Sequence, residues 1–348
     1  PPAHGVERFM HTLPVLETIQ RFLRSRGYRT VGIGANPYLE KERFLSFPAD
    51  DLFGFQNGFD EYYYLEARGA QHEPEGELFE AYAAGSRINE LYFNFLERFL
   101  WNARDPMDQP HFAYLHYMDS HQPWVRSAPL PGVTGKFHPA GLSGEDVHAA
   151  DRDFMRRLVA FRASDPLSAD DVRRLQAIYA EAAHYVDRWI GALIDGLQTR
   201  ALLRNTMLIL TADHGDALYE HGRIGHAQTL SEVALKVPLI LFGDPFAPGA
   251  VEGRVSNAAV FPTVMEIFGA RLDAPLAYSL LDFTRPGAGD IPVFASMYER
   301  DALVTPGGAK YMQTEGAPLF FDIEKDPGET APLPPDPPVA PPLPDAPT

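Results

Sequence analysis

The stretch Met207–Phe242 constrains the fold more than any other part of the chain. It opens with four consecutive apolar residues, 207–210, a pattern typical of a strand that is buried on both faces of a parallel sheet. The apolar run ends close to Asp213-His214-Gly215. Ligands of open α/β sheets bind beyond the carboxyl ends of the strands, so we expect a site here. A carboxylate beside an imidazole is a natural pair of ligands for a divalent metal ion.

Helical and strand patterns alternate ahead of this stretch. Apolar residues at three-to-four spacing predict the helices, and short apolar runs predict the strands between them. The predicted elements before residue 207 are helices over 12–27, 86–100 and 168–197 and strands over 30–34 and 112–118. Ser168 and Asp171 form a capping-box pattern at the start of the third helix. This order predicts an α/β fold with a mostly parallel central sheet flanked by helices.

The period of the apolar residues changes towards the C-terminus. A second strand, Val237–Phe242, and a helix over 256–268 follow the Asp-His pair. Later apolar runs predict a small antiparallel sheet with strands over 291–298, 302–305, 309–313 and 319–322. We therefore expect three parts, namely an α/β domain over 1–285, an antiparallel subdomain over 286–330 and a proline-rich disordered tail over 331–348.

Two segments lack clear periodicity. Residues 40–80 are rich in aromatic side chains, and we expect them to form a loop region over the sheet. Residues 125–165 are rich in Pro, Gly, His and charge, and we expect a surface excursion near the mouth of the site.

The composition argues against several classes of partner. The formal net charge is −17, whereas nucleic acids and anionic membrane surfaces are bound mainly through basic patches. The chain contains no cysteine, so it has neither a disulfide nor a thiolate metal site. No apolar run reaches the ~18 residues that indicate a transmembrane helix. Neither the compartment nor the oligomeric state follows from these features.

Each candidate residue also has a purely structural interpretation. Gly215 after a strand is ordinary turn chemistry, and an isolated Asp-His-Gly occurs often by chance. His121 follows the strand 112–118 and, in isolation, is more typical of a surface residue. His184 and Asp187 lie about one helical turn apart in the long helix, and we interpret them as locally hydrogen-bonded residues rather than metal ligands.

The order of several motifs resembles the C-terminal signature of the sulfatases, members of the alkaline phosphatase superfamily. These motifs are, in order, Asp213-His214-Gly215, Glu220-His221-Gly222, Gly225-His226 and Leu235-Lys236-Val237-Pro238. The resemblance implies that Asp213 and His214 are metal ligands and that His226 contacts the substrate anion. The stretch LHYMDSHQPW resembles the sulfatase segment in which a histidine, here His121, reaches the anionic group.

The resemblance also implies parts that this sequence lacks. In the family, further acidic metal ligands end the first strand, and the nucleophile is a modified cysteine or serine in a Cys/Ser-x-Pro-x-Arg motif. Residues 2–6 resemble the segment after this motif, so we expect the catalytic N-terminal strand to precede residue 1 and the chain alone to be inactive. Asn36 stands where many arylsulfatases carry residues that contact sulfate, and it is a further candidate for substrate binding.

The leading hypothesis is a metal-dependent hydrolase of sulfate esters that acts on an anionic small-molecule, saccharide or lipid ester. Asp213 and His214 would bind the metal, while His226 and His121 would bind the anion or protonate the leaving group. The metal is calcium by family habit, whereas a histidine ligand favours manganese or zinc. The alternatives are a phosphodiesterase, phosphonate ester hydrolase or phosphoethanolamine-type transferase of the same superfamily, and a non-catalytic relative that keeps the fold.

Overall fold

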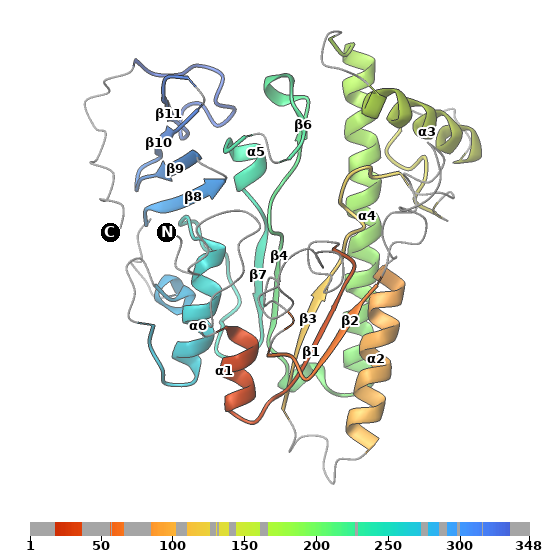
Figure 1. Ribbon diagram of the computed structural model, residues 1–348, viewed down its shortest axis with the longest axis vertical. Helices are drawn as coiled ribbons and strands as arrows, with labels where there is room; N and C mark the ends of the chain where they lie inside the picture. The colour runs from red at the N-terminus through yellow and green to blue at the C-terminus, as the bar shows by residue number, and fades with distance from the viewer. Residues whose placement is uncertain are drawn as a thin grey trace, which may run out of the picture. The chain divides into compact units, whose positions relative to one another are not determined.

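The computed structural model describes most of the chain between residues 18 and 334 (Figure 1). The described residues are 18–36, 56, 58–65, 85–101, 110–125, 130, 132–138, 144–160, 166–226, 229–272, 278–284, 291–297, 300–314 and 316–334. They form two compact units, Gln20–Leu202 and a second that contains the described part of Leu203–Thr348. The predicted α/β class, with a parallel sheet and a small antiparallel sheet near the C-terminus, is confirmed.

A parallel three-stranded sheet forms the centre of the unit Gln20–Leu202. In spatial order its strands are β2 (Glu61–Tyr64), β1 (Arg29–Gly34) and β3 (His111–His116). Gly34 pairs with His116 at the carboxyl ends of β1 and β3, so both strands end at the same edge. Val31 and Ile33 on the central strand are completely buried. The two predicted strands of this region, 30–34 and 112–118, therefore correspond to β1 and β3.

Strand β2 corrects the expectation of a loop over 40–80. Three consecutive tyrosines give it no apolar alternation, but aromatic side chains pack well on a half-buried sheet. Asp60 holds the start of β2 in place. Its Oδ2 accepts the Thr30 N–H at 2.8 Å, and its Oδ1 lies 3.0 Å from the Arg24 guanidinium. Residues 40–55 and 66–80 lie outside the described part of the chain.

Two helices, α1 (Ile19–Ser25) and α2 (Gly85–Trp101), accompany this sheet. The helix α1 ends before Gly27, whose φ of +86° is the left-handed conformation expected at a glycine stop. The helix α2 packs against β1, β3 and the long helix α4 (Ala169–Thr199) (Figure 1). The part of the predicted first helix before residue 18 lies outside the described residues.

Helix α4 begins as the sequence predicts. Ser168 Oγ accepts the Asp171 N–H at 3.1 Å, and Asp171 Oδ2 accepts the Ser168 N–H at 3.1 Å, which completes the capping box. Helix α3 (Gly144–Ala160), in contrast, corrects the expectation of an irregular excursion over 125–165. Its buried residues are Val147, His148, Asp151, Phe154, Met155 and Leu158. This spacing is helical, but two of these positions are polar, so the apolar period is hidden.

Buried His111 should make the stability of this unit depend on pH. Its ring lies against Phe95 and Phe99, and Nε2 is 2.8 Å from Tyr92 Oη. Burial lowers the pKa of His111 to about 4. The unfolded chain therefore binds a proton at about pH 6.5 that the folded chain does not bind until about pH 4, and stability falls as pH is lowered through this window.

We expect this contribution to reach about 3 kcal/mol at pH 4. Urea denaturation at pH 7 and at pH 4.5 measures it. His111→Phe removes the titrating group and keeps an aromatic ring in place, so the variant should lose about 2 kcal/mol less than the wild type between these pH values. Equal losses in the two proteins would show that His111 is not the titrating group.

The second unit contains the strand that precedes the Asp-His pair. β4 (Leu208–Thr211) is a strand as predicted, but it pairs in antiparallel fashion with β7 (Leu239–Phe242), and residues 208–210 are only half-buried. The expectation of a parallel strand buried on both faces is therefore wrong for β4. A parallel neighbour needs a crossover connection, usually a full helix, whereas the helix α5 (Glu232–Leu235) between β4 and β7 has four residues.

Short elements complete this part of the second unit. They are the 3₁₀ turns η3 (Leu203–Asn205), η4 (Glu220–Gly222), η5 (Asn257–Ala259) and η6 (Leu280–Thr284), the paired strands β5 (Ala217–Leu218) and β6 (Ile224–Gly225), and the helix α6 (Val260–Ile267). The predicted helix over 256–268 corresponds to η5 and α6, and Gly269 follows with a φ of +70°.

The predicted C-terminal antiparallel sheet is confirmed. It comprises β8 (Val293–Met297), β9 (Arg300–Val304), β10 (Ala309–Met312) and β11 (Leu319–Asp322), paired in the spatial order β11-β10-β9-β8. Gly307 and Gly308 form the turn between β9 and β10, with φ values of +86° and +83°. Val304, Phe321 and Ile323 form its buried core. Residues 335–348 of the expected tail lie outside the described residues.

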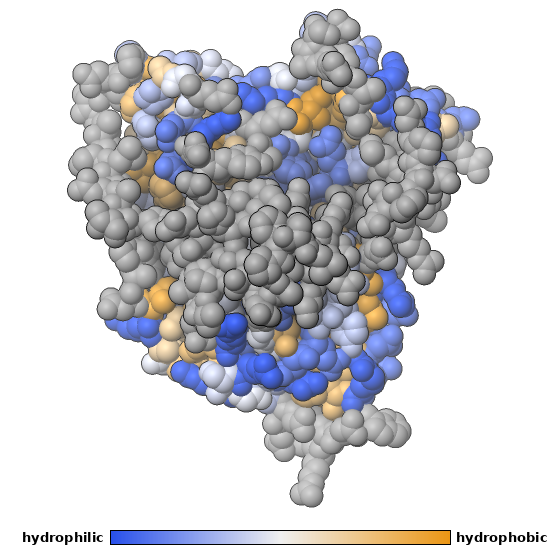
Figure 2. Space-filling model, viewed as in Figure 1, coloured by the Kyte–Doolittle hydropathy of each residue, from blue (hydrophilic) through white to orange (hydrophobic). Residues whose placement is uncertain are grey.

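The surface in the view of Figure 2 is mixed in polarity. Where its residues are coloured, hydrophobic side chains appear as scattered patches among hydrophilic ones. None of the helices in the described part of the chain combines the length and the apolar character needed to cross a membrane.

Candidate active site

Asp213 and His214 lie in the loop that follows β4, as the sequence predicts. The side chain of Asp213 is 63% exposed and that of His214 is 34% exposed. Asp213 Oδ1 accepts the N–H of His214 at 3.1 Å, and Asp213 Oδ2 lies 3.8 Å from His214 Nε2. Nδ1 of His214 donates to the carbonyl of Gly215 at 3.0 Å, so Nε2 is the nitrogen that carries the lone pair in the neutral ring.

The loop is held in place by a close approach at Gly215. A Cβ atom at this position would lie 2.2 Å from the carbonyl oxygen of Val233, so only glycine fits. The Gly215 N–H donates to the carbonyl of Ala234 at 2.8 Å. Both contacts fall on the short helix α5, which therefore sets the position of the loop.

Asn257 holds the start of the same loop. Its Nδ2 donates to the carbonyl of Ala212 at 2.8 Å, and its Oδ1 accepts the hydroxyl proton of Thr211 at 2.9 Å. Thr211 Oγ1 also lies 2.9 Å from the carbonyl of Pro238, next to β7. The backbone that carries Asp213 is therefore fixed from both directions along the chain.

Asp216 and His226 are brought together by the hairpin of β5 and β6. Ala217 pairs with Gly225, so the residues just outside that pair, Asp216 and His226, emerge side by side. Asp216 Oδ1 accepts the Nδ1 proton of His226 at 2.8 Å, and the Asp216 side chain is only 5% exposed. This hydrogen bond raises the pKa of His226, against the opposing effect of burial.

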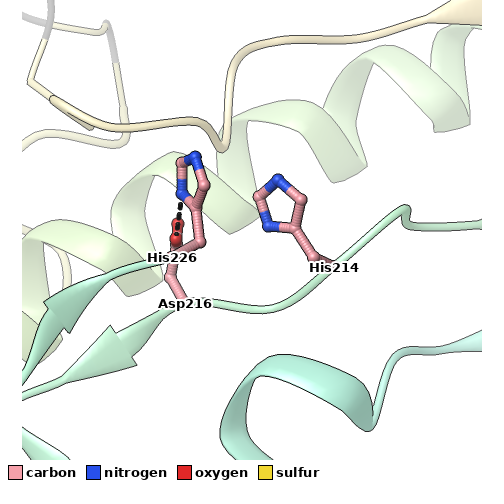
Figure 3. A group of neighbouring side chains, drawn as sticks. All are labelled: His214, Asp216 and His226. Atoms are coloured by element: carbon pink, nitrogen blue, oxygen red, sulfur yellow. Dashed lines mark hydrogen bonds and ion pairs between the residues drawn. The ribbon is translucent and has the colours of Figure 1, made fainter. Parts of the chain in front are cut away.

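Figure 3 shows His214, Asp216 and His226 as one group. The two imidazole rings stack, with their centroids 4.1 Å apart and their planes inclined by 29°. One ligand atom from each of the three residues falls within 4.8 Å of the others. The arrangement places two imidazoles and a carboxylate at one end of β4.

The donor set fits a divalent cation. Ligand atoms at about 2.0–2.6 Å from one ion lie at most roughly 4–5 Å apart, and the 3.8 Å between Asp213 Oδ2 and His214 Nε2 is within that limit. Asp216 orients His226, because its Oδ1 accepts the imidazole proton.

Asp216 is the residue that the sequence reasoning missed. Its signal was its place two residues after His214 in an Asp-His-Gly-Asp run, but an aspartate in a turn has an ordinary structural explanation. Its near-complete burial beside an imidazole is visible only in the folded chain.

The other two candidates, Asn36 and His121, belong to the unit Gln20–Leu202. Asn36 follows β1 and His121 follows β3, and the parallel register of these strands places both residues beyond the same edge of the sheet. Nδ1 of His121 donates to the carbonyl of Gln122 at 2.7 Å. The neighbouring Asp119 is buried and its Oδ1 accepts the N–H of Gly85 at the start of α2, which is a structural role.

Comparison with known families decides the class of the protein. The sulfatase family profile matches residues 12–270 of the 348-residue chain. The chain belongs to the sulfatase family. The resemblance inferred from the Asp213-His214-Gly215 and Gly225-His226 motifs is therefore confirmed.

Curated relatives of this sulfatase chain include a choline-sulfatase from Rhizobium meliloti (strain 1021), which is 30% identical over 174 residues, 47% of this chain and 34% of the relative. The multifunctional alkaline phosphatase superfamily protein PehA from Trinickia caryophylli is 27% identical over 361 aligned positions, which cover 89% of this chain and 67% of that protein. This sulfatase chain thus spans about a third of the first relative's length and two thirds of the second's.

Solved structures of similar fold include BT4656 in complex with D-glucosamine-2-N,6-O-disulfate, with a TM-score of 0.63 at 18% identity over 92% of this chain and 79% of that chain. The phosphonate monoester hydrolase SpPMH from Silicibacter pomeroyi has a TM-score of 0.62 at 19% identity over 90% of this chain and 76% of that chain. At these identities the likeness concerns the fold alone.

Proposed function

We propose that this sulfatase chain carries the metal-binding and anion-contacting part of a divalent-metal-dependent hydrolase of sulfate esters. The observation that carries the proposal is the group formed by Asp213, His214, Asp216 and His226 at the end of β4. A structural role alone does not explain why an exposed carboxylate, two stacked imidazoles and a buried carboxylate gather there.

In this proposal Asp213 and His214 hold the metal, each with one of the two atoms that lie 3.8 Å apart. The bound cation would attract the ester's anionic oxygens and offset the negative charge that develops on them. Calcium follows family habit, while the imidazole of His214 favours manganese or zinc.

His226 contacts the anion or protonates the departing oxygen. Asp216 accepts the Nδ1 proton, which fixes the ring and leaves Nε2 to exchange a proton with the ester. The raised pKa of His226 increases the fraction of rings that are protonated near neutral pH, as a donor to an anion requires. His121 and Asn36, beyond the edge of the parallel sheet, are the further candidates to contact the substrate.

The runner-up function is hydrolysis of a phosphonate monoester or phosphodiester, or phosphoethanolamine transfer. It is supported by the fold shared with a phosphonate monoester hydrolase. The relative PehA, a multifunctional protein of the alkaline phosphatase superfamily, aligns with most of this chain. The third hypothesis is a non-catalytic relative. The joint presence of Asp213, His214, His226 and His121 argues against it.

The substrate class is tested on the metal-loaded full-length protein. Release of inorganic sulfate from alkyl, saccharide and aryl sulfate esters is compared with turnover of a phosphonate monoester and a phosphodiester. We expect kcat/KM to be highest for a sulfate ester. Preference for the phosphonate or the diester would support the phosphonate or phosphodiester hydrolase hypothesis. No turnover of any ester would favour the non-catalytic hypothesis.

His226→Ala should lower kcat by about 10² or more if the imidazole is a general acid. Asp216→Asn should lower kcat to a similar extent, because the neutral amide lacks the negative charge that stabilises the protonated imidazole of His226. If Asp216 acts through His226, the double variant should be no slower than His226→Ala alone, since residues that act as a unit are not additive.

His221→Ala is the matched control, because His221 belongs to the same hairpin but not to the group in Figure 3. It should retain nearly full kcat. Multiplicative losses in the double variant would show that Asp216 acts independently of His226, and an unchanged kcat in His226→Ala would remove that residue from the mechanism.

A further inference from the structure

A second group of potential metal ligands lies in the unit Gln20–Leu202. His138 precedes α3, Asp151 lies in α3 and Glu181 lies in α4. The three side chains are 4%, 3% and 9% exposed, respectively. One ligand atom from each lies within 4.8 Å of the other two. Three polar side chains from separate segments thus converge inside the fold.

The position of His138 Nε2 is unusual. This nitrogen is buried and makes no hydrogen bond within the described residues, yet it lies 3.1 Å from Asp151 Oδ2 and 3.9 Å from Glu181 Oε1. A buried nitrogen that faces two carboxylates without an aligned hydrogen bond needs a positive charge beside it, either its own proton or a bound cation.

The charges around this group leave negative charge in excess. Arg174 Nε lies 2.8 Å from Asp151 Oδ1 and neutralises one carboxylate. Arg174 thus offsets the charge of Asp151, whereas Glu181 faces the imidazole of His138 at 3.9 Å.

We propose that His138, Asp151 and Glu181 bind a divalent cation of the zinc type, separate in sequence from the site at Asp213 and His214. One imidazole with two carboxylates is a ligand set suited to zinc, whereas calcium and magnesium prefer oxygen alone. Three protein ligands leave one tetrahedral position for water.

The spacing agrees with this ion. Ligand atoms of a tetrahedral zinc at about 2.0–2.2 Å are separated by roughly 3.3–3.6 Å. The distances from His138 Nε2 to the two carboxylates, 3.1 and 3.9 Å, bracket that range, so small side-chain adjustments complete the geometry.

Groups behind the ligands orient them as in other metal sites. Arg174 occupies Oδ1 of Asp151 and leaves Oδ2 towards His138. Oε1 of Glu181 accepts the Gly135 N–H at 2.7 Å, which ties it to the segment that carries His138. Such partners fix the ligands before the metal arrives. The bound ion would join the segment 132–138 to α3 and α4 and so stabilise this unit.

The test measures how many zinc ions bind to a variant in which the site at Asp213 and His214 has been removed. The Asp213→Ala, His214→Ala variant is dialysed against Zn²⁺, and we expect it to bind one equivalent. His138→Gln and Glu181→Gln in this background should weaken binding by at least about 100-fold, because loss of a second-sphere partner alone costs 10–100-fold. His184→Gln is the control, since His184 contacts Lys136 rather than the three ligands, and it should keep the equivalent.

A spectroscopic measurement covers the case in which a ligand variant does not fold. Co²⁺ added to the background protein should give the visible absorption of a four-coordinate site, and Zn²⁺ should abolish it. The melting temperature should also rise with Zn²⁺ concentration. No zinc equivalent in the background protein, an equivalent that survives His138→Gln, or preference for Ca²⁺ over Zn²⁺ would each overturn the proposal.

Discussion

Asp213→Ala should abolish divalent-metal binding at the end of β4 and reduce ester hydrolysis by at least about 10³, since a metal supplies several kcal/mol of transition-state stabilisation. The side chain is 63% exposed, so its removal should cost the fold little. Metal binding to the full-length protein is measured by titration calorimetry, and turnover is measured on the sulfate ester with the highest kcat/KM.

Asp153→Ala is the matched control for this variant. The side chain of Asp153, on α3, is 71% exposed. The Asp153→Ala substitution therefore removes the same charge from the protein surface as Asp213→Ala. It should leave metal affinity and kcat unchanged. Undiminished activity in Asp213→Ala would end its assignment as a metal ligand, while equal losses in both variants would mean that net charge, not coordination, is responsible.

Lys310→Met should destabilise the protein by about 3–5 kcal/mol, the usual cost of removing one partner of a buried ion pair. Lys310 on β10 has a completely buried side chain. Its Nζ lies 2.8 Å from Glu232 Oε1 and 2.7 Å from Glu329 Oε1. The Glu329 side chain is 2% exposed, so the variant would leave a buried carboxylate without its cation.

Lys325→Met provides the comparison. Lys325 pairs with Asp322 at 2.6 Å, but its side chain is 85% exposed, and such surface pairs contribute about 0–1 kcal/mol. Urea denaturation should separate the two variants clearly. A similar small loss in both would show that Lys310 is not required to neutralise the buried glutamates.

The Lys310 variant should also affect catalysis at temperatures where the protein remains folded. Glu232 is the first residue of α5, and the carbonyl of Ala234 in that helix holds the N–H of Gly215. Loosening α5 therefore shifts the loop that carries Asp213 and His214. A measurable fall in metal affinity below the unfolding transition would report this shift, which an effect on global stability alone would not produce.

Elements with strong local signals were predictable from the sequence. The capping box of Ser168 and Asp171 fixes the start of α4, and the glycines at 307 and 308 fix the turn between β9 and β10. In each case the responsible contacts lie within a few residues of one another, so a linear pattern contains them.

Elements whose polar residues are buried by distant partners were not predictable. The face of α3 includes Asp151, which is acceptable there because Arg174 on α4 pairs with it. β2 has no apolar alternation, yet Asp60 ties it to Thr30. The antiparallel pairing of β4 with β7 is equally invisible in an apolar run, which is compatible with either direction.

The residues of the candidate site also differ in whether a short motif or a long-range contact identifies them. Asp213, His214 and His226 were proposed because they belong to short motifs at strand ends. In the folded chain His214 stacks on His226 and Asp213 lies beside His214. The contribution of Asp216 depends on its contact with His226 across a hairpin, and that of His138 depends on α3 and α4. Neither relation exists in the linear sequence.

The shared carboxyl edge of β1 and β3 has a consequence for the evolution of new substrates. Asn36 and His121 sit on the segments after these strands, while the strands themselves contribute only packing. If Asn36 and His121 contact the substrate as proposed, exchange of those segments should alter which leaving group is accepted without any change in the sheet. Libraries for new ester specificity should vary Asn36 and the half-buried residues 120–123, and they should keep the buried Ala35, Met118, Asp119 and Trp124.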